Sequence, residues 1–397
     1  WSLLLSGNDK FVGTDGDDAI DLSIDAGNDL YDMGAGNDWV RGGLGNDTIN
    51  GGDGWDVLSF EWTAYGDVTH MVRGITVNVT AGTVKDPYGF DDSFTSVEEF
   101  HGSISRDRFV GGAEGKDFYG LRGADVFVAG TSGDDWICYQ FDIRFGGYRG
   151  IVANLGVSVS GSNVLGTVRD GFGNIDKTTN INNIGGTQYA DSFTGNANAN
   201  IFDGGEGKDT YQGGAGSDWL SFDLWFAVAD QYGISVDLRK TTGQVIDDGF
   251  GNKENATSIE NIFGSFANDV IIGSKGDNII RGGGGNDTMT GAGGADNFNW
   301  SFVAENGGAE RITDFQAGAG KDQDILSFGM SNEGLPTTLT LVIGTVATAP
   351  GVATFVFNAA THVLSFDADG AGAAYDMVDI VTLAGVTSLT ADNFLLY

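Results

Sequence analysis

Acidic side chains at a constant spacing are the residues of this sequence best suited to chemistry. Aspartate or asparagine recurs every nine residues in three groups: Asp29, Asp38, Asp47 and Asp56; Asp191, Asn200, Asp209 and Asp218; Asp269, Asn278, Asp287 and Asp296. Asp18 precedes the first group by eleven residues. A fourth, looser group is spaced by ten, eight and ten residues: Asp107, Asp117, Asp125 and Asp135. We expect all these side chains to be metal ligands, because Ca²⁺ prefers carboxylate and amide oxygens.

Glycine surrounds these positions in the pattern G-G-x-G-x-D-x-(apolar)-x, as in "GGLGNDTIN" at 42 and "GGEGKDTYQ" at 204. Glycine adopts positive φ without steric cost, so the pattern predicts a tight turn whose carbonyls point inward. Ca²⁺ takes about six to eight oxygens, and backbone carbonyls complete the set. The expected backbone ligands are Gly42, Leu44, Gly45, Gly51, Asp53, Gly54, Gly204, Glu206, Gly207, Gly213, Ala215, Gly216, Gly282, Gly284, Gly285, Gly291, Gly293 and Gly294.

The three residues after each aspartate predict the elements that position it. The x-apolar-x sequence is long enough for a very short strand with one inward side chain. The expected inward residues are Ile20, Tyr31, Val40, Ile49, Leu58, Tyr211, Leu220, Ile279, Met289 and Phe298. Two nonapeptides then make one coil, and on the order of ten calcium ions are held between successive turns. The fold class is all-β: a parallel β-roll or β-solenoid of calcium-binding nonapeptides with β inserts and a C-terminal β cap.

A longer repeat of about 80 residues lies above the nonapeptide. "DPYGFDDSFTSVEEFHGS", "DGFGNIDKTTNINNIGGT" and "DGFGNKENATSIENIFGS" begin at Asp86, Asp170 and Asp248. The alternating stretches "GITVNV" at 74, "GIVANL" at 150 and "GISVDL" at 233 precede them and predict strands. We expect these segments to continue the coil without calcium or to form small β layers against it. The predicted division is an N-terminal block (1–60), three repeat units (61–138, 139–221, 222–300) and a C-terminal region (301–397).

The amino-acid composition limits which kinds of partner the chain can bind. The chain has 20 basic and 55 acidic residues and a net charge of −35, so it lacks the basic footprint that nucleic acids require. Such self-repulsion destabilises a compact state unless cations neutralise it. No stretch of about 18 apolar residues predicts a membrane span. The single cysteine, Cys138, excludes an intrachain disulfide, so another source of stability is expected.

The nonapeptide resembles the RTX (repeat-in-toxin, hemolysin-type calcium-binding) family of bacterial proteins. "ERITDFQAGAGKDQDILSF" (310–328) and the segment from 353 to 397 resemble the C-terminal region of RTX proteins exported by type I secretion. The resemblance implies an uncleaved C-terminal export signal, with the type I secretion machinery as a partner. It also implies a location outside the cell or on the cell surface of a Gram-negative bacterium. A strand hairpin with inward Phe355, Phe357, Leu364 and Phe366 is expected to cap the solenoid.

No catalytic constellation is apparent, and we expect the chain not to be an enzyme. His70, His101 and His362 are scattered and form no H-E-x-x-H motif, and no G-x-S-x-G motif occurs. "GKD" at 115, 207 and 320 is not followed by the serine or threonine of a phosphate-binding loop. Cys138 follows Trp136 and Ile137 in a repeat strand, where a small core residue is the expected role. A glycosidase carboxylate pair within the inserts is the alternative.

Two classes of function follow. The first is a secreted, calcium-folded structural protein of a surface layer, extracellular filament or adhesin. Its partners would be calcium ions, other copies of the chain and cell-surface polysaccharide. The second is a C-terminal folding and secretion module of a larger enzyme of the protease, lipase or alginate epimerase type, whose catalytic domain precedes Trp1. In both, the calcium-free chain is expected to be disordered, because unneutralised carboxylates repel and glycine loses much entropy on folding.

Overall fold

A computed structural model describes most of the chain. The described residues are 7–22, 26–61, 73–131, 133–223, 232–301, 310–318, 320–330, 340–370 and 377–397. They form two compact units, Trp1–Gly205 and Glu206–Tyr397, each built almost entirely of strands. The described residues contain no α-helix and only two short 3₁₀ turns, η1 (Asp142–Phe145) and η3 (Ala391–Asn393). No helix in the described part of the chain has the length and apolarity needed to cross a membrane.

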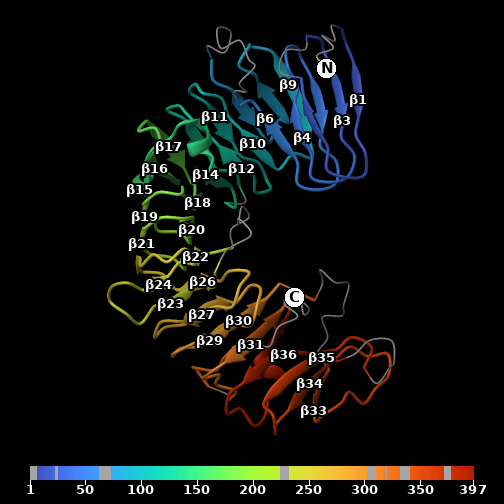
Figure 1. Ribbon diagram of the computed structural model, residues 1–397, viewed down its shortest axis with the longest axis vertical. Helices are drawn as coiled ribbons and strands as arrows, with labels where there is room; N and C mark the ends of the chain where they lie inside the picture. Colours follow the sequence, from blue (N-terminus) through green and yellow to red (C-terminus); the bar gives the residue numbers. More distant parts are fainter. Residues whose placement is uncertain are drawn as a thin grey trace. The chain divides into compact units, whose positions relative to one another are not determined.

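In the first unit, successive nonapeptides alternate between two sheets, so one coil contributes one strand to each (Figure 1). Sheet II is parallel, and in spatial order its strands are β2 (Ala19–Asp21), β4 (Trp39–Arg41), β6 (Val57–Ser59), β10 (Glu99–His101), β12 (Asp117–Tyr119), β14 (Trp136–Cys138), β18 (Asn183–Gly185) and β20 (Ile201–Asp203). The middle residues of neighbouring strands pair in register and point into the core, where they are at most 2% exposed: Val40, Leu58, Phe100, Phe118, Ile137, Ile184 and Phe202. One apolar side chain per strand therefore builds the core, as the nonapeptide predicts.

Sheet I of the first unit contains the inserts. Its spatial order is β1 (Lys10–Val12), β3 (Leu30–Asp32), β5 (Thr48–Asn50), β9 (Asp91–Thr95), β8 (Thr83–Lys85), β7 (Thr76–Asn78), β11 (Arg108–Val110), β13 (Val126–Val128), β17 (Ile175–Thr179), β16 (Asn163–Arg169), β15 (Val152–Ser160) and β19 (Ser192–Thr194). The strands expected at 74 and 150 are confirmed as β7 and β15. They lie within the sheet rather than against it, because β8 and β16 pair antiparallel with both of their neighbours.

The second unit repeats this plan. Its sheet II consists of β22 (Trp219–Ser221), β26 (Asn261–Phe263), β28 (Ile279–Arg281), β30 (Asn297–Trp300), β32 (Ile325–Phe328) and β37 (Phe394–Leu396). On the side of sheet I, β21 (Thr210–Gln212) pairs with β25 (Asn255–Thr257). A separate nine-stranded sheet follows on this side, with the order β24 (Val245–Asp247), β23 (Ser235–Asp237), β27 (Val270–Ile272), β29 (Thr288–Thr290), β31 (Glu310–Ile312), β36 (Val378–Leu383), β35 (Val363–Asp367), β34 (Thr354–Asn358) and β33 (Leu341–Ile343).

One expected core position is corrected in β28. Ile280, the middle residue, is 0% exposed and pairs with Ile262 and Phe298. Ile279, expected to point inward, is the first strand residue and only partly buried. Counting from the turn residue Asn278 explains the shift, since the inward side chain comes two positions after the turn residue in every coil.

The C-terminal hairpin is confirmed. Strands β34 and β35 pair antiparallel, and their four apolar residues are at most 7% exposed: Phe355, Phe357, Leu364 and Phe366. Strand β36 joins this hairpin to β31, and β37 pairs with β32 as the last strand of sheet II. The C-terminal residues thus continue both sheets of the second unit.

Candidate calcium-binding turns

The predicted ligands lie along two edges of the coils. Edge I comprises the turns that lead into strands of sheet I, and edge II comprises the turns that lead into strands of sheet II. Edge I carries Asp29, Asp47, Asp107, Asp125, Asp191, Asp209, Asp269 and Asp287. Edge II carries Asp18, Asp38, Asp56, Asp135, Asn200, Asp218, Asn278 and Asp296. Apart from Asp18, these residues are at most 3% exposed.

Asp117 is the exception among the predicted ligands. It is the first residue of β12, and Lys116 takes the turn position before it. The backbone N–H of Lys116 donates to Asp135 Oδ1 over 3.0 Å. In other coils, the backbone N–H of the turn aspartate makes this hydrogen bond. The ammonium nitrogen of Lys116 lies 3.2 Å from Glu98 Oε1, so a lysine side chain occupies this point of edge II.

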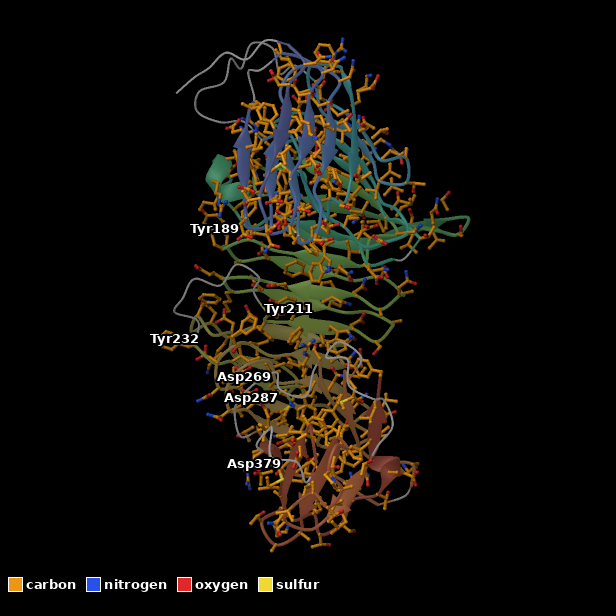
Figure 2. The ribbon with its side chains drawn as sticks, turned by 90° about the vertical axis from the view of Figure 1, so that its right-hand side faces the viewer. Tyr189, Tyr211, Tyr232, Asp269, Asp287 and Asp379 are labelled. Carbon is orange, nitrogen blue, oxygen red and sulfur yellow. The ribbon has the colours of Figure 1, made fainter. Side chains whose placement is uncertain are left out.

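Hydrogen bonds from one coil to the next hold many of the turn carboxylates. Oδ1 of Asp47 accepts the backbone N–H of Asp29 over 2.9 Å, and Oδ1 of Asp56 accepts that of Asp38 over 2.9 Å. Asp287 accepts the N–H of Asp269 over 2.8 Å, and Figure 2 shows these two residues following one another along the second unit. The carboxylates are therefore fixed at the spacing of the coils.

The second carboxylate oxygen in several of these turns has no protein partner. Oδ2 of Asp38, Asp56 and Asp125 is buried and accepts no hydrogen bond from any described residue. An ionised oxygen buried without a partner is strongly destabilising. A bound cation would satisfy it, so the donor set fits Ca²⁺, which binds carboxylate and carbonyl oxygens together.

Glycine is required in these turns for two separate reasons. A β-carbon at Gly282 would lie 2.3 Å from Asp287 Oδ2, so the first glycine leaves room for the carboxylate. Gly52, the second glycine of its turn, has φ +116°, and a β-carbon there would lie 1.9 Å from the carbonyl oxygen of Gly34. All the predicted carbonyl ligands lie in such glycine turns: 42–47, 51–56, 204–209, 213–218, 282–287 and 291–296. The carbonyls of Leu44 and Asp53 each already accept one N–H from the preceding coil.

Electrostatics also favours a cation. Burial, and then the charges of Asp107 and Asp176, raises the pKa of Asp125 to about 10. Burial raises the pKa of both Asp56 and Asp287 to about 6. The protein alone therefore cannot keep every turn carboxylate ionised at neutral pH, whereas a divalent cation between coils would reverse this effect.

The sequence prediction missed six further carboxylates at equivalent positions. Each accepts the backbone N–H of the turn residue one coil earlier, over 2.8–3.1 Å: Asp92, Asp176 and Glu254 on edge I, and Glu98, Glu260 and Asp324 on edge II. Five of them belong to the longer repeat. They are the sixth or twelfth residue after Asp86, Asp170 or Asp248, so aligning the three repeats would have found them.

The other candidate groups have different environments. Cys138 is buried among Tyr119, Leu121 and Phe141, which confirms the prediction that it is a small buried core residue. His101 lies between Glu61 and Glu99, His362 Nδ1 contacts the carbonyl of Val386, and His70 lies outside the described residues. Among the described residues, no group of three or more His, Cys, Asp or Glu side chains is arranged to hold a metal. Any ion in the turns would therefore need backbone carbonyls as well as carboxylates.

Comparison with known families agrees with this geometry. The family model described as the RTX calcium-binding nonapeptide repeat (4 copies) matches residues 32–62, 185–220 and 263–298. These segments contain glycine turns in both units. A search of curated proteins found no match to the chain.

Proposed function

The chain carries RTX calcium-binding nonapeptide repeats, and from this premise we propose that it is a secreted protein whose β-roll folds when calcium binds outside the cell. After folding it serves a structural role in a surface layer, extracellular filament or adhesin. The observation that carries the calcium part is the row of buried Oδ2 atoms without a protein partner, as at Asp38 and Asp56.

Charge and location together favour folding after export. With a net charge of −35, the chain repels itself in the absence of cations. Extracellular calcium modules have dissociation constants of about 10⁻⁴–10⁻³ M, well above the free calcium inside a cell. Type I secretion of an unfolded chain is consistent with this, and the resemblance of the C-terminal region to exported RTX proteins supports it. Binding to the native state alone then stabilises the fold by mass action.

The structural role is supported by the distribution of the described residues among the structural elements. The described residues are distributed over coils, inserts and a C-terminal cap, and the turn carboxylates are engaged in the ladder of hydrogen bonds between coils. An acidic surface would also allow calcium to bridge one copy of the chain to another.

Light scattering and electron microscopy of the purified chain across a calcium titration would test this role. Regular filaments or sheets at millimolar calcium are expected. A chain that folds with calcium but stays monomeric at every concentration would contradict the structural role and favour a folding module of a larger secreted enzyme. A chain that binds no calcium would contradict the proposal as a whole.

A further inference from the structure

Six turns on the two edges differ from the glycine turns in sequence. They carry serine, threonine or asparagine at the second position and follow the pattern G-[S/T/N]-x-x-x-[D/N]. Their residues are 13–18, 102–107, 186–191, 195–200, 264–269 and 273–278. The turn 130–135 fits the same sequence pattern but is not one of them, because the backbone N–H of Thr131 donates to the carbonyl of Gly112. The sixth residues are Asp18, Asp107, Asp191, Asn200, Asp269 and Asn278, all of which the nine-residue period predicts as calcium ligands. We call them polar turns.

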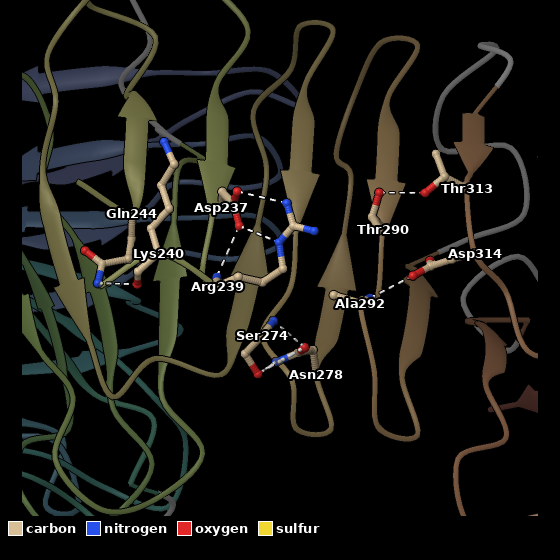
Figure 3. Close-up of polar contacts among 10 residues, drawn as sticks. All are labelled: Asp237, Arg239, Lys240, Gln244, Ser274, Asn278, Thr290, Ala292, Thr313 and Asp314. Carbon is tan, nitrogen blue, oxygen red and sulfur yellow. Dashed lines mark hydrogen bonds and ion pairs between the residues drawn. The ribbon is translucent and has the colours of Figure 1, made fainter. Parts of the chain in front are cut away.

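Hydrogen bonds within the turn occupy the sixth side chain in every polar turn. The backbone N–H of the second residue donates to it over 2.6–2.8 Å in all six. The second side chain in turn accepts the backbone N–H of the fourth residue. Figure 3 shows the Ser274 and Asn278 pair that closes one of these turns.

The backbone of the polar turns also differs. In glycine turns the second and fourth residues have positive φ, as at Gly52 (+116°) and Gly54 (+135°). In the six polar turns, neither the second nor the fourth residue has positive φ. The two kinds of turn therefore orient their carbonyls differently, and the calcium cradle of one is not present in the other.

Where asparagine is the sixth residue of a polar turn, its side-chain NH₂ group places a hydrogen-bond donor between neighbouring coils. Asn278 Nδ2 donates to the carbonyl of Glu260 over 2.6 Å, and Asn200 Nδ2 donates to the carbonyl of Asn182 over 3.1 Å. An amide N–H₂ group is a donor and cannot ligate a cation. In these two turns, the amide joins neighbouring coils directly.

Three polar turns lie where an insert enters sheet I. Oδ1 of Asp107 accepts the N–H of Ile75 over 2.7 Å, and Oδ1 of Asp269 accepts that of Ile234 over 2.7 Å. Asp191 accepts the N–H of Ile151 over 2.5 Å in the same way. On the preceding side, the neighbour of each of these turns is the start of an insert strand instead of another nonapeptide turn. The insert therefore replaces the turn that would complete a calcium site on that side, whereas the following side still meets a turn of the next coil, as at Asp269 and Asp287.

We propose that the sixth residues of the six polar turns are not calcium ligands, and that these turns are joints closed by the chain's own hydrogen bonds. Calcium binding is then confined to the other turns, and three of the six joints lie where an insert interrupts the coils. This inference rests on the proposed calcium-dependent folding, because it assigns which turns take part in it.

Asp18→Asn and Asp38→Asn are a matched pair of tests on neighbouring coils of edge II. Asp18 lies in a polar turn, where asparagine has a precedent in Asn278. Asp38 lies in the turn 33–38, whose second and fourth residues, Gly34 and Gly36, have positive φ as in the glycine turns. There the new amide replaces the buried Oδ2. Bound calcium per chain is measured by equilibrium dialysis with atomic emission. We expect the wild-type number for D18N and a loss of at least one ion for D38N.

The outcomes separate this inference from the proposed function. A D18N variant that loses an ion as D38N does would overturn the inference and leave calcium-dependent folding intact. A wild-type chain with no bound calcium would instead overturn the proposed function.

Converting a polar turn into a glycine turn is an independent test that does not depend on losing a ligand. The double change Ser274→Gly and Asn278→Asp turns "GSKGDN" into "GGKGDD", which matches the pattern of "GGEGKD" at 204. We expect at least one additional bound calcium ion. No gain in a folded variant would contradict the view that Ser274 and Asn278 exclude calcium.

Discussion

His101 shows how burial and neighbouring charge act on a single residue of this protein. It follows the inward Phe100 in β10, so its ring lies on the outer side of sheet II, yet it is only 5% exposed. One ring nitrogen contacts Glu99 and the other lies 3.4 Å from Glu61. Two ionised carboxylates can both accept from imidazole only when both ring nitrogens carry protons. A protonated His101 therefore forms ion pairs with the buried Glu99 and the partly buried Glu61.

The pKa shifts of His101 and Glu61 predict a pH dependence. Burial lowers the pKa of His101, but hydrogen bonds to Glu61 and Glu99 outweigh it, so the net shift is upward from 6.5. Burial raises the pKa of Glu61, but the hydrogen bond to His101 and the charges of His101 and Arg41 together outweigh it, so the net shift is downward from 4.5. The stabilisation is therefore fully present between about pH 4.5 and 6.5 and is lost as pH rises through the folded-state pKa of His101.

The variant His101→Gln checks this prediction. At pH 6 and saturating calcium, it should lose on the order of 3 kcal/mol of unfolding free energy, because the buried Glu99 and the partly buried Glu61 lose their cation. The loss should shrink at alkaline pH, where wild-type His101 is neutral. Urea unfolding of both proteins at pH 6 and pH 9 measures the difference. An equal loss at both pH values would contradict a charged His101.

Among the structural elements, the glycine turn restricts which side chains the coil can accommodate. Its second glycine combines a left-handed φ with close contact to the preceding coil, as at Gly52 against Gly34. The two effects are separable, because Gly146 also has positive φ (+92°) but nothing lies within 4 Å of a β-carbon placed there.

Gly52→Ala and Gly146→Ala should therefore differ strongly. G146A should cost about 1–2 kcal/mol, the penalty of a left-handed conformation for an L-residue. G52A should cost clearly more and should weaken calcium binding, because the two coils must separate to admit the methyl group. Unfolding midpoints at saturating calcium and calcium titrations of both variants test this. Equal costs would show that close contact between coils is unimportant.

Across the whole molecule, the inserts determine how much of the structure could be predicted from the sequence. The nine-residue period correctly places Asp29, Asp47 and their strands, because the turn and the inward residue are local features. Asp92 and Glu98 follow the turn residues of the preceding coil by 45 and 42 residues, so the period alone cannot connect them. The shift from Asp117 to Lys116 has the same origin, since "GGAEGKD" has one residue more before its aspartate than "GGLGND".

The sequence pattern also could not predict where the insert strands lie in the sheets. Alternation predicts that "GIVANL" is a strand, but it does not state which edge the strand pairs with. In the first unit, each insert adds two strands to sheet I and none to sheet II among the described residues. The polar turns beside the inserts could have been recognised from their serine or threonine, but their effect becomes visible only with the hydrogen bonds of the turn.

The most direct test of the central claim is circular dichroism of the wild-type chain during a calcium titration that starts in excess chelator. The account predicts a disordered spectrum without calcium and a cooperative change to β structure near millimolar calcium. A β spectrum that persists unchanged in chelator would contradict calcium-dependent folding.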